Sequence, residues 1–149
     1  MASQKELILL STGKTLWNKW RRDYAEVQAL EPDLHKADLH GVDLQGVDLH
    51  GADLTEANLQ GADLSDVDLH ESDLRNANLK NANLSNANLQ KAHLRWADLR
   101  GANLAGANLK DADLSKADLR GANLEGANLS KADLRDSMRT EPVIPVIKV

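Results

Sequence analysis

The chain has 149 residues, a net charge of −5, no Cys and no Phe. This length allows one domain, and the lack of Cys excludes a disulfide framework, a thiol nucleophile and a thiolate metal site. With only three Trp and one Tyr as aromatic residues, the interior must be narrow and filled mostly by aliphatic side chains.

Residues 1–31 form the first predicted unit, a helical cap. Its apolar residues recur at the helical spacings of three, four or seven, namely Leu7, Leu10, Trp17, Trp20, Tyr24 and Val27. The segment is one amphipathic helix, or two helices broken near residue 12, where Ser or Thr would cap the second helix. We expect the apolar stripe to pack on the open end of the column that follows, because an uncovered β-edge invites pairing with other molecules. A partner-binding aromatic face is the alternative.

The sequence of this unit argues against a membrane or signal segment and against a phosphate-binding loop. Residues 7–10 form the longest aliphatic run, which is too short to span a membrane and is not flanked as in a signal peptide, so we expect a cytoplasmic protein without membrane contact. Residues 13–15 read Gly-Lys-Thr, as at the end of a phosphate-binding loop, but Ile8 replaces the first Gly that such a loop requires. We therefore expect no nucleotide and no other cofactor.

Residues 32–136 form the second unit, in which Leu recurs at every fifth position from Leu34 to Leu134. The 21 repeats read A-(D/N)-L-x-x, and His93 is the single exception to Asp or Asn before Leu. A helix would spread such leucines around its axis, and a flat strand would place them on alternate faces. A chain that turns a corner in every repeat instead points Ala and Leu inward and Asp or Asn outward.

Four corners close a coil of about 20 residues, so the repeats predict an all-β solenoid of about five coils, roughly 25 Å long. The last residue of the repeat is Gly or Asn in eleven repeats, and these types tolerate the positive φ of a type II turn. Because Lys91 and Trp96 also occupy this position, we expect a mixture of turn types.

The third unit is the C-terminal tail, residues 137–149, which begins where Ser137 and Met138 replace the expected Asn–Leu pair. Its prolines and β-branched residues favour an extended chain. The tail could lie under the last coil, add as a strand to a neighbouring molecule, or be mobile, and we favour contact with the column or with a second subunit. A homodimer through a column end or through the tail is therefore one of the alternatives.

The tandem repeats, such as Ala-Asp-Leu-His-Gly and Ala-Asn-Leu-Lys-Asn, resemble those of the pentapeptide repeat family over about 70% of the chain. Residues 17–21 are similar to the N-terminal cap of cyanobacterial members. The resemblance implies a right-handed quadrilateral β-helix without enzymatic activity, so we expect a structural or interaction (scaffold) module with an unknown protein partner. The quinolone-resistance members imply the alternative, a DNA mimic that modulates a type II topoisomerase.

Charge is uneven along the repeats and defines a candidate partner surface. Residues 33–73 carry eleven acidic and one basic side chain, whereas residues 74–136 carry seven acidic and ten basic ones. In a 20-residue register the late basic residues stack in columns near the place where the repeat is broken, and this surface comprises Arg75, Lys80, His93, Arg95, Trp96, Arg100, Arg120 and Arg135. A basic strip with an exposed aromatic residue suits an acidic partner, and a solvated charged face is the alternative. The negative net charge argues against direct nucleic-acid binding.

The same register stacks His50 on His70 and places His35 and His40 on neighbouring corners, among many carboxylates. Such a set suits zinc or nickel. Because this repeat position also accepts Gln, Arg, Lys and Ser, we expect solvent-facing histidines and assign no metal site. The outward Asp and Asn recur in nearly every repeat, so we expect them to bond to nearby backbone and neighbouring coils, and we assign no catalytic residue.

Overall fold

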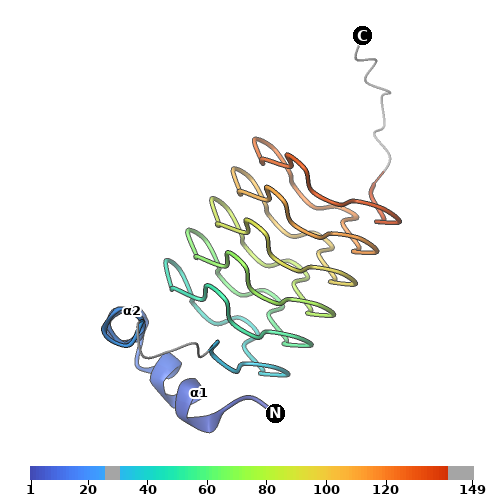
Figure 1. The fold of residues 1–149 in the computed structure, drawn as a ribbon. Coiled ribbons are helices and arrows are strands. Elements are labelled where there is room, and N and C mark those ends of the chain that lie inside the picture. Colours follow the sequence, from blue (N-terminus) through green and yellow to red (C-terminus); the bar gives the residue numbers. More distant parts are fainter. Residues whose placement is uncertain (26–30, 141–149) are drawn as a thin grey trace.

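The computed structural model describes residues 1–25 and 31–140. Figure 1 shows the repeats as coils stacked in one column, with two helices at its N-terminal end. Helix α1 spans Gln4–Ser11 and helix α2 spans Lys14–Asp23. Neither helix has the length and apolar character that crossing a membrane requires, and the described residues contain no other helix.

The predicted break between two helices is confirmed, but the predicted Ser or Thr cap is wrong. Gly13 precedes α2 with a φ of 102°, in the left-handed region that favours glycine, and its carbonyl accepts from the Trp17 N–H at 3.1 Å. The hydroxyls of Ser11 and Thr12 donate backwards to carbonyls of α1, at 2.6 and 2.5 Å. Both hydroxyls therefore bond to carbonyls of α1 and do not cap α2, so the residue that precedes α2 is Gly13, which has no side chain to cap it.

The coil length of 20 residues is confirmed by the backbone. The residue at the Asp/Asn position of each repeat forms a parallel β-bridge with the residue 20 positions further on, from the Asp33–Asp53 pair to the Asp118–Met138 pair. The prediction of β-strands is right only in part. Each of the 18 bridges is isolated, and no strand forms within residues 31–140, because a corner follows each bridged residue before a second bridge can join it.

The inward and outward faces are also as predicted. Leu and Ala fill the column, and central leucines such as Leu84 and Leu89 are 0% exposed. Ser72 takes an Ala position and is also 0% exposed, because its hydroxyl donates to the Leu69 carbonyl at 2.7 Å. In the first coil, Val42 takes an Ala position but is 37% exposed, so the prediction of inward burial is wrong there. Burial also weakens in the last coil, where the inward residues are half-buried, namely Ala122, Leu124, Ala127, Leu129, Ala132 and Leu134.

All 21 corners share one backbone conformation, so the expected mixture of turn types is wrong. The last residue of every repeat has a φ between 55° and 74°, including Lys91 at 58° and Trp96 at 64°. Across each corner an N–H bonds to the Leu carbonyl, as from Ala97 to Leu94 at 2.9 Å, which makes a type II turn. The N–H of Trp96 also donates to the Ser115 carbonyl of the next coil, at 3.2 Å. The stack therefore imposes positive φ even on residues that disfavour it.

We predict that this strain can be relieved at Glu56, an exposed corner residue with a φ of 58°. Glu56→Gly should be more stable than Glu56→Ala by roughly 1 kcal/mol, because both changes remove the charge but only Gly avoids the left-handed penalty of a side chain. Urea denaturation followed by circular dichroism measures the difference. Equal midpoints for the two variants would contradict strain at the corners.

The cap replaces the coil that is missing before the first one, as predicted. The indole N–H of Trp17, which is 0% exposed, donates to the Asp48 carbonyl at 2.7 Å. Asn18 donates to the Gly46 carbonyl at 3.0 Å and accepts the Asp48 N–H at 2.8 Å. Further along the column, the N–H and carbonyl groups equivalent to those of Asp48 bond to the preceding coil, so the side chains of α2 complete the ladder and cover its edge.

The predicted apolar stripe of the cap is correct for most of its members. Leu10 is buried, and Leu7 and Trp20 are half-buried against the core. The prediction is wrong for Tyr24, which is 48% exposed, because it lies one residue beyond α2, where the backbone has left helical geometry with a φ of −111°. Val27 lies outside the described residues.

The residues after Asp136 are shifted by one repeat position from the prediction, which aligned Ser137 and Met138 with the Asn–Leu pair. Met138 bridges to Asp118 and therefore occupies the Asp/Asn position, so that Arg139, and not Met138, falls at the Leu position. A charged side chain at an inward position cannot extend the apolar core, which explains why the repeats end here. The predicted contact of the tail concerns residues 141–149, which lie outside the described residues.

Candidate interaction surface

The Asp and Asn side chains organise the outer faces of the column. Their Oδ1 atoms accept the backbone N–H two residues further on, as in Asp43 with Gln45 at 3.0 Å. Several Asn side chains also donate to the coil before, as in Asn78 Nδ2 to Asn58 Oδ1 at 3.3 Å. The predicted structural role of these residues is confirmed. In each repeat, the side chain two residues after the Asp or Asn therefore lies beside this carboxylate or amide.

Most arginines of the candidate partner surface are held by the Asp two residues before them. Their Nη2–Oδ2 distances are 2.5 or 2.6 Å, in the pairs Arg75–Asp73, Arg100–Asp98, Arg120–Asp118 and Arg135–Asp133. Arg100 Nε also lies 3.7 Å from Asp118 of the neighbouring coil. These four guanidinium groups are therefore largely neutralised by the column itself.

The ion pairs shift the acidity of the carboxyls. Hydrogen bonds from Arg135 lower the pKa of Asp133 from 3.8 to about 2. Burial acts to raise the pKa of Asp73, but the hydrogen bonds and charge of Arg75 outweigh it, and the pKa is lowered. The carboxyls of the other two pairs also have lowered pKa values, chiefly through hydrogen bonds from their arginines.

Acid is expected to destabilise the column as these carboxyls take up protons. A carboxyl with a lowered folded-state pKa stabilises the protein above its unfolded-state pKa of 3.8, and this stability is lost as pH falls through the folded-state value, which for Asp133 is about 2. We expect the Tm, measured by thermal denaturation, to fall between about pH 4 and pH 2. Arg135→Gln should lower the Tm at pH 7 and reduce this fall. A Tm that is constant down to pH 2 would contradict the prediction.

Arg95 is the exception among these arginines, because the residue two positions before it is His93. In the ladder His93 bridges Asp73 on one side and Asp113 on the other, so the repeat of Arg95 has no carboxylate of its own. Arg95 is exposed and forms no ion pair or side-chain hydrogen bond within residues 31–140. The single break in the Asp/Asn ladder therefore leaves one guanidinium without its usual partner.

Trp96 lies next to Arg95 on the same corner and is 55% exposed. Lys116, one coil further on, places its Nζ 4.9 Å from the centre of the Trp96 ring. Lys80 is half-buried, and its backbone N–H donates to the side chain of Asn78 at 3.1 Å. Lys116 was missed in the candidate surface, although its position 20 residues after Trp96 was a usable signal.

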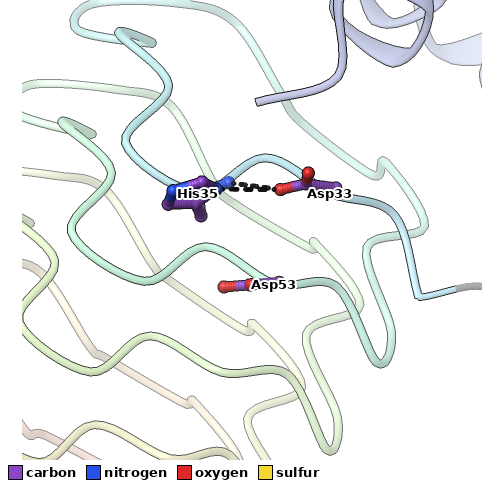
Figure 2. A group of neighbouring side chains, drawn as sticks. All are labelled: Asp33, His35 and Asp53. Atoms are coloured by element: carbon purple, nitrogen blue, oxygen red, sulfur yellow. Dashed lines mark hydrogen bonds and ion pairs between the residues drawn. The ribbon is translucent and has the colours of Figure 1, made fainter. Parts of the chain in front are cut away.

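Within the described residues, two groups of His and Asp side chains bring their possible ligand atoms within 4.8 Å of one another. The groups are Asp33, His35 and Asp53, and Asp48, His50 and Asp68. Figure 2 shows the first, with Asp33 and His35 on one coil and Asp53 on the next. A set of one nitrogen and two oxygen donors suits zinc. The His35 Nδ1 atom, however, lies 3.2 Å from Asp33 Oδ1, and the same contact between Asp and the side chain two residues further on recurs along the column.

The second group is part of the contact between cap and column. His50 Nδ1 lies 2.5 Å from Asp48 Oδ1, and Nη2 of Arg21 in α2 lies 3.0 Å from both ring nitrogens of His50. The rings of His50 and His70 stack as predicted, with centres 4.9 Å apart and planes at 4°. The parallel rings of His50 and His70 direct their nitrogen lone pairs side by side and not towards a common ion. The guanidinium of Arg21 already lies beside the carboxylate of Asp48. We therefore assign neither group a metal.

A family model described as pentapeptide repeats matches residues 33–70, 62–101 and 97–136. No curated protein sequence matches significantly.

Solved structures from cyanobacteria are similar in sequence and fold. HetL from Nostoc sp. strain PCC 7120, a pentapeptide repeat protein involved in heterocyst differentiation regulation, is 36% identical over 70% of this chain and 56% of that chain, with a TM-score of 0.54. Rfr23 from Cyanothece 51142 is 32% identical over 83% of this chain and 94% of that chain, with a TM-score of 0.61. QnrB1, a plasmid-mediated fluoroquinolone resistance protein, is 26% identical over 67% of this chain and 58% of that chain, with a TM-score of 0.42, which supports no functional inference. The chain thus spans little more than half the length of HetL.

Proposed function

The chain belongs to the pentapeptide repeat family, and we propose that it acts as a non-enzymatic interaction module that displays side chains to a protein partner. The observation that supports this best is the regular display of its outward residues. Backbone hydrogen bonds join each coil to the next, so residues 20 positions apart lie in fixed columns. We also assign the coils the right-handed quadrilateral winding of the family, whose four-sided shape is supported by the four corners per coil. The units are residues 1–31 as cap, 32–136 as column and 137–149 as tail.

We place the partner surface on the corner columns of the later coils, centred on Arg95 and Trp96. The remaining members of the surface flank this centre and are Arg75, Lys80, His93, Arg100, Arg120 and Arg135. Four of the flanking arginines are already paired with carboxylates, so they can frame a partner but contribute little free charge.

Crosslinking in a lysate of the source organism tests this proposal. The wild-type chain should recover discrete protein species, and the double variant Arg95→Glu/Trp96→Ala should lose them. Glu125→Ala, an exposed change on a different corner, serves as the control and should retain them. If the wild-type chain recovers no protein, the proposed function is wrong, and if the double variant recovers the same species, the surface lies elsewhere.

The DNA-mimic alternative is favoured only by the first coils. Carboxylates stack there without intervening arginines, as in the bridged pair Asp43 and Asp63. In the later coils, by contrast, arginine pairs such as Arg100–Asp98 interrupt the negative surface. A DNA gyrase supercoiling assay with excess protein separates the two functions, since inhibition or protection of the gyrase would favour the alternative.

A further inference from the structure

We propose that Arg95, Trp96 and Lys116 form a recognition site for an acidic peptide segment, and that His93 creates this site by standing where other repeats carry Asp or Asn. The inference rests on the proposed interaction function and names the chemistry of the partner.

The unpaired charge belongs to Arg95. The equivalent arginine one coil earlier, Arg75, is held by Asp73 at 2.5 Å. The carboxylate on the other side of His93, Asp113, accepts both the N–H and the hydroxyl of Ser115, at 2.9 and 2.6 Å. Within residues 31–140 neither carboxylate forms an ion pair or hydrogen bond with the side chain of Arg95. Its guanidinium can therefore bind a carboxylate from another molecule in a two-pronged arrangement.

The exposed ring belongs to Trp96, which the column itself does not need. Eight other repeats have Gly at the position equivalent to Trp96. Trp96 adopts the same backbone conformation, with a φ of 64°, which costs a residue with a side chain roughly 1 kcal/mol. More than half of the residue is exposed, so burial offsets little of this cost. Lys116 holds its ammonium over the ring, which adds a second cation to the same patch. The exposed indole can accept an apolar side chain while the cations of Arg95 and Lys116 bind carboxylates.

The surrounding charge favours a peptide over a nucleic acid. Nucleic-acid binding depends on many phosphate contacts, whereas this patch offers one free guanidinium and one ammonium between arginines that are already paired. The earlier coils carry eleven acidic side chains against one basic, which would repel a long polyanion along the column. A short acidic segment can reach the patch without lying along those coils.

Fluorescence anisotropy with a labelled peptide of alternating Glu and Leu tests the site, with the matching Gln and Leu peptide as the uncharged probe. The wild-type chain should bind the Glu peptide, more weakly as salt is raised, and should bind the Gln peptide at least about tenfold less tightly. The decisive variant is His93→Asp, which keeps Arg95, Trp96 and Lys116 but restores the usual pair. It should weaken binding about tenfold, while the Tm stays equal or rises, because Asp is native to this position in other repeats.

Asn103→Asp is the matched control, since it adds the same charge within a different column of the ladder and should change the affinity less than about twofold. Equal binding by wild type and His93→Asp, equal binding of the two peptides, or tighter binding of a labelled DNA duplex would each overturn the acidic-peptide site. If the wild-type chain binds no peptide but lysate crosslinking still recovers a protein that Arg95→Glu/Trp96→Ala loses, the peptide chemistry is wrong and the interaction function is retained. Recovery of no protein would instead remove the interaction function.

Discussion

Trp17→Ala is expected to lower the free energy of unfolding by about 4 kcal/mol. Trp17 is 0% exposed, and its indole N–H donates to the Asp48 carbonyl at 2.7 Å. The substitution removes the fully buried aromatic ring of the cap and leaves a cavity between α2 and the first coil. It also leaves a backbone carbonyl at the edge of the ladder without its donor.

Two further variants separate these effects. Trp17→Phe keeps most of the buried ring but loses the N–H, and should cost about 1 to 2 kcal/mol. Trp20→Ala removes a half-buried ring whose centre lies 5.1 Å from that of Trp17, and should cost less than Trp17→Ala.

Because each coil contacts only its neighbours, hydrogen exchange in Trp17→Ala should quicken most in the first coil and least in residues 83–103. A uniform loss of protection along the column would contradict this local role.

The column was predictable from the sequence because a period of five leaves few structures open. An unbroken Leu ladder at this spacing specifies a corner in every repeat, hence the inward Leu and Ala and the 20-residue register. The prediction of mixed turn types is wrong at Lys91 and Trp96 because the preferences of these residue types do not decide the corner. Hydrogen bonds to the next coil override that preference, and all corners take the same positive φ. Local propensity is a weak guide where a stacked neighbour fixes the backbone.

The candidate surface was predictable as a set of columns but not as a set of free charges. The pairing of Arg75 with Asp73 was readable from their spacing of two residues, and the same spacing singles out Arg95 after His93. The contact of Arg21 with His50 was not readable, because it depends on how α2 lies against the column, and the repeat pattern says nothing about that orientation. Side chains within the repeat could therefore be placed, whereas contacts between cap and column required the structure.

Leu84→Ala is expected to lower the free energy of unfolding by about 3 kcal/mol, whereas Leu129→Ala should cost no more than about 1 kcal/mol. Leu84 is 0% exposed in the middle of the column, where hydrogen-bonded coils on both sides prevent the cavity from collapsing. Leu129 occupies the same repeat position in the last coil but is half-buried. Urea denaturation of the two variants against wild type measures both costs.

This comparison also tests whether the last coil is covered in solution. If Leu129→Ala proves as costly as Leu84→Ala, the C-terminal end of the column must be buried by something outside residues 31–140, as the predicted contact with the tail or with a second subunit requires. Light scattering then distinguishes the two, since only a second subunit doubles the mass. If the two costs differ as expected, the apolar end of the last coil is open to solvent, and its half-buried leucines contribute less to stability than those of any central coil.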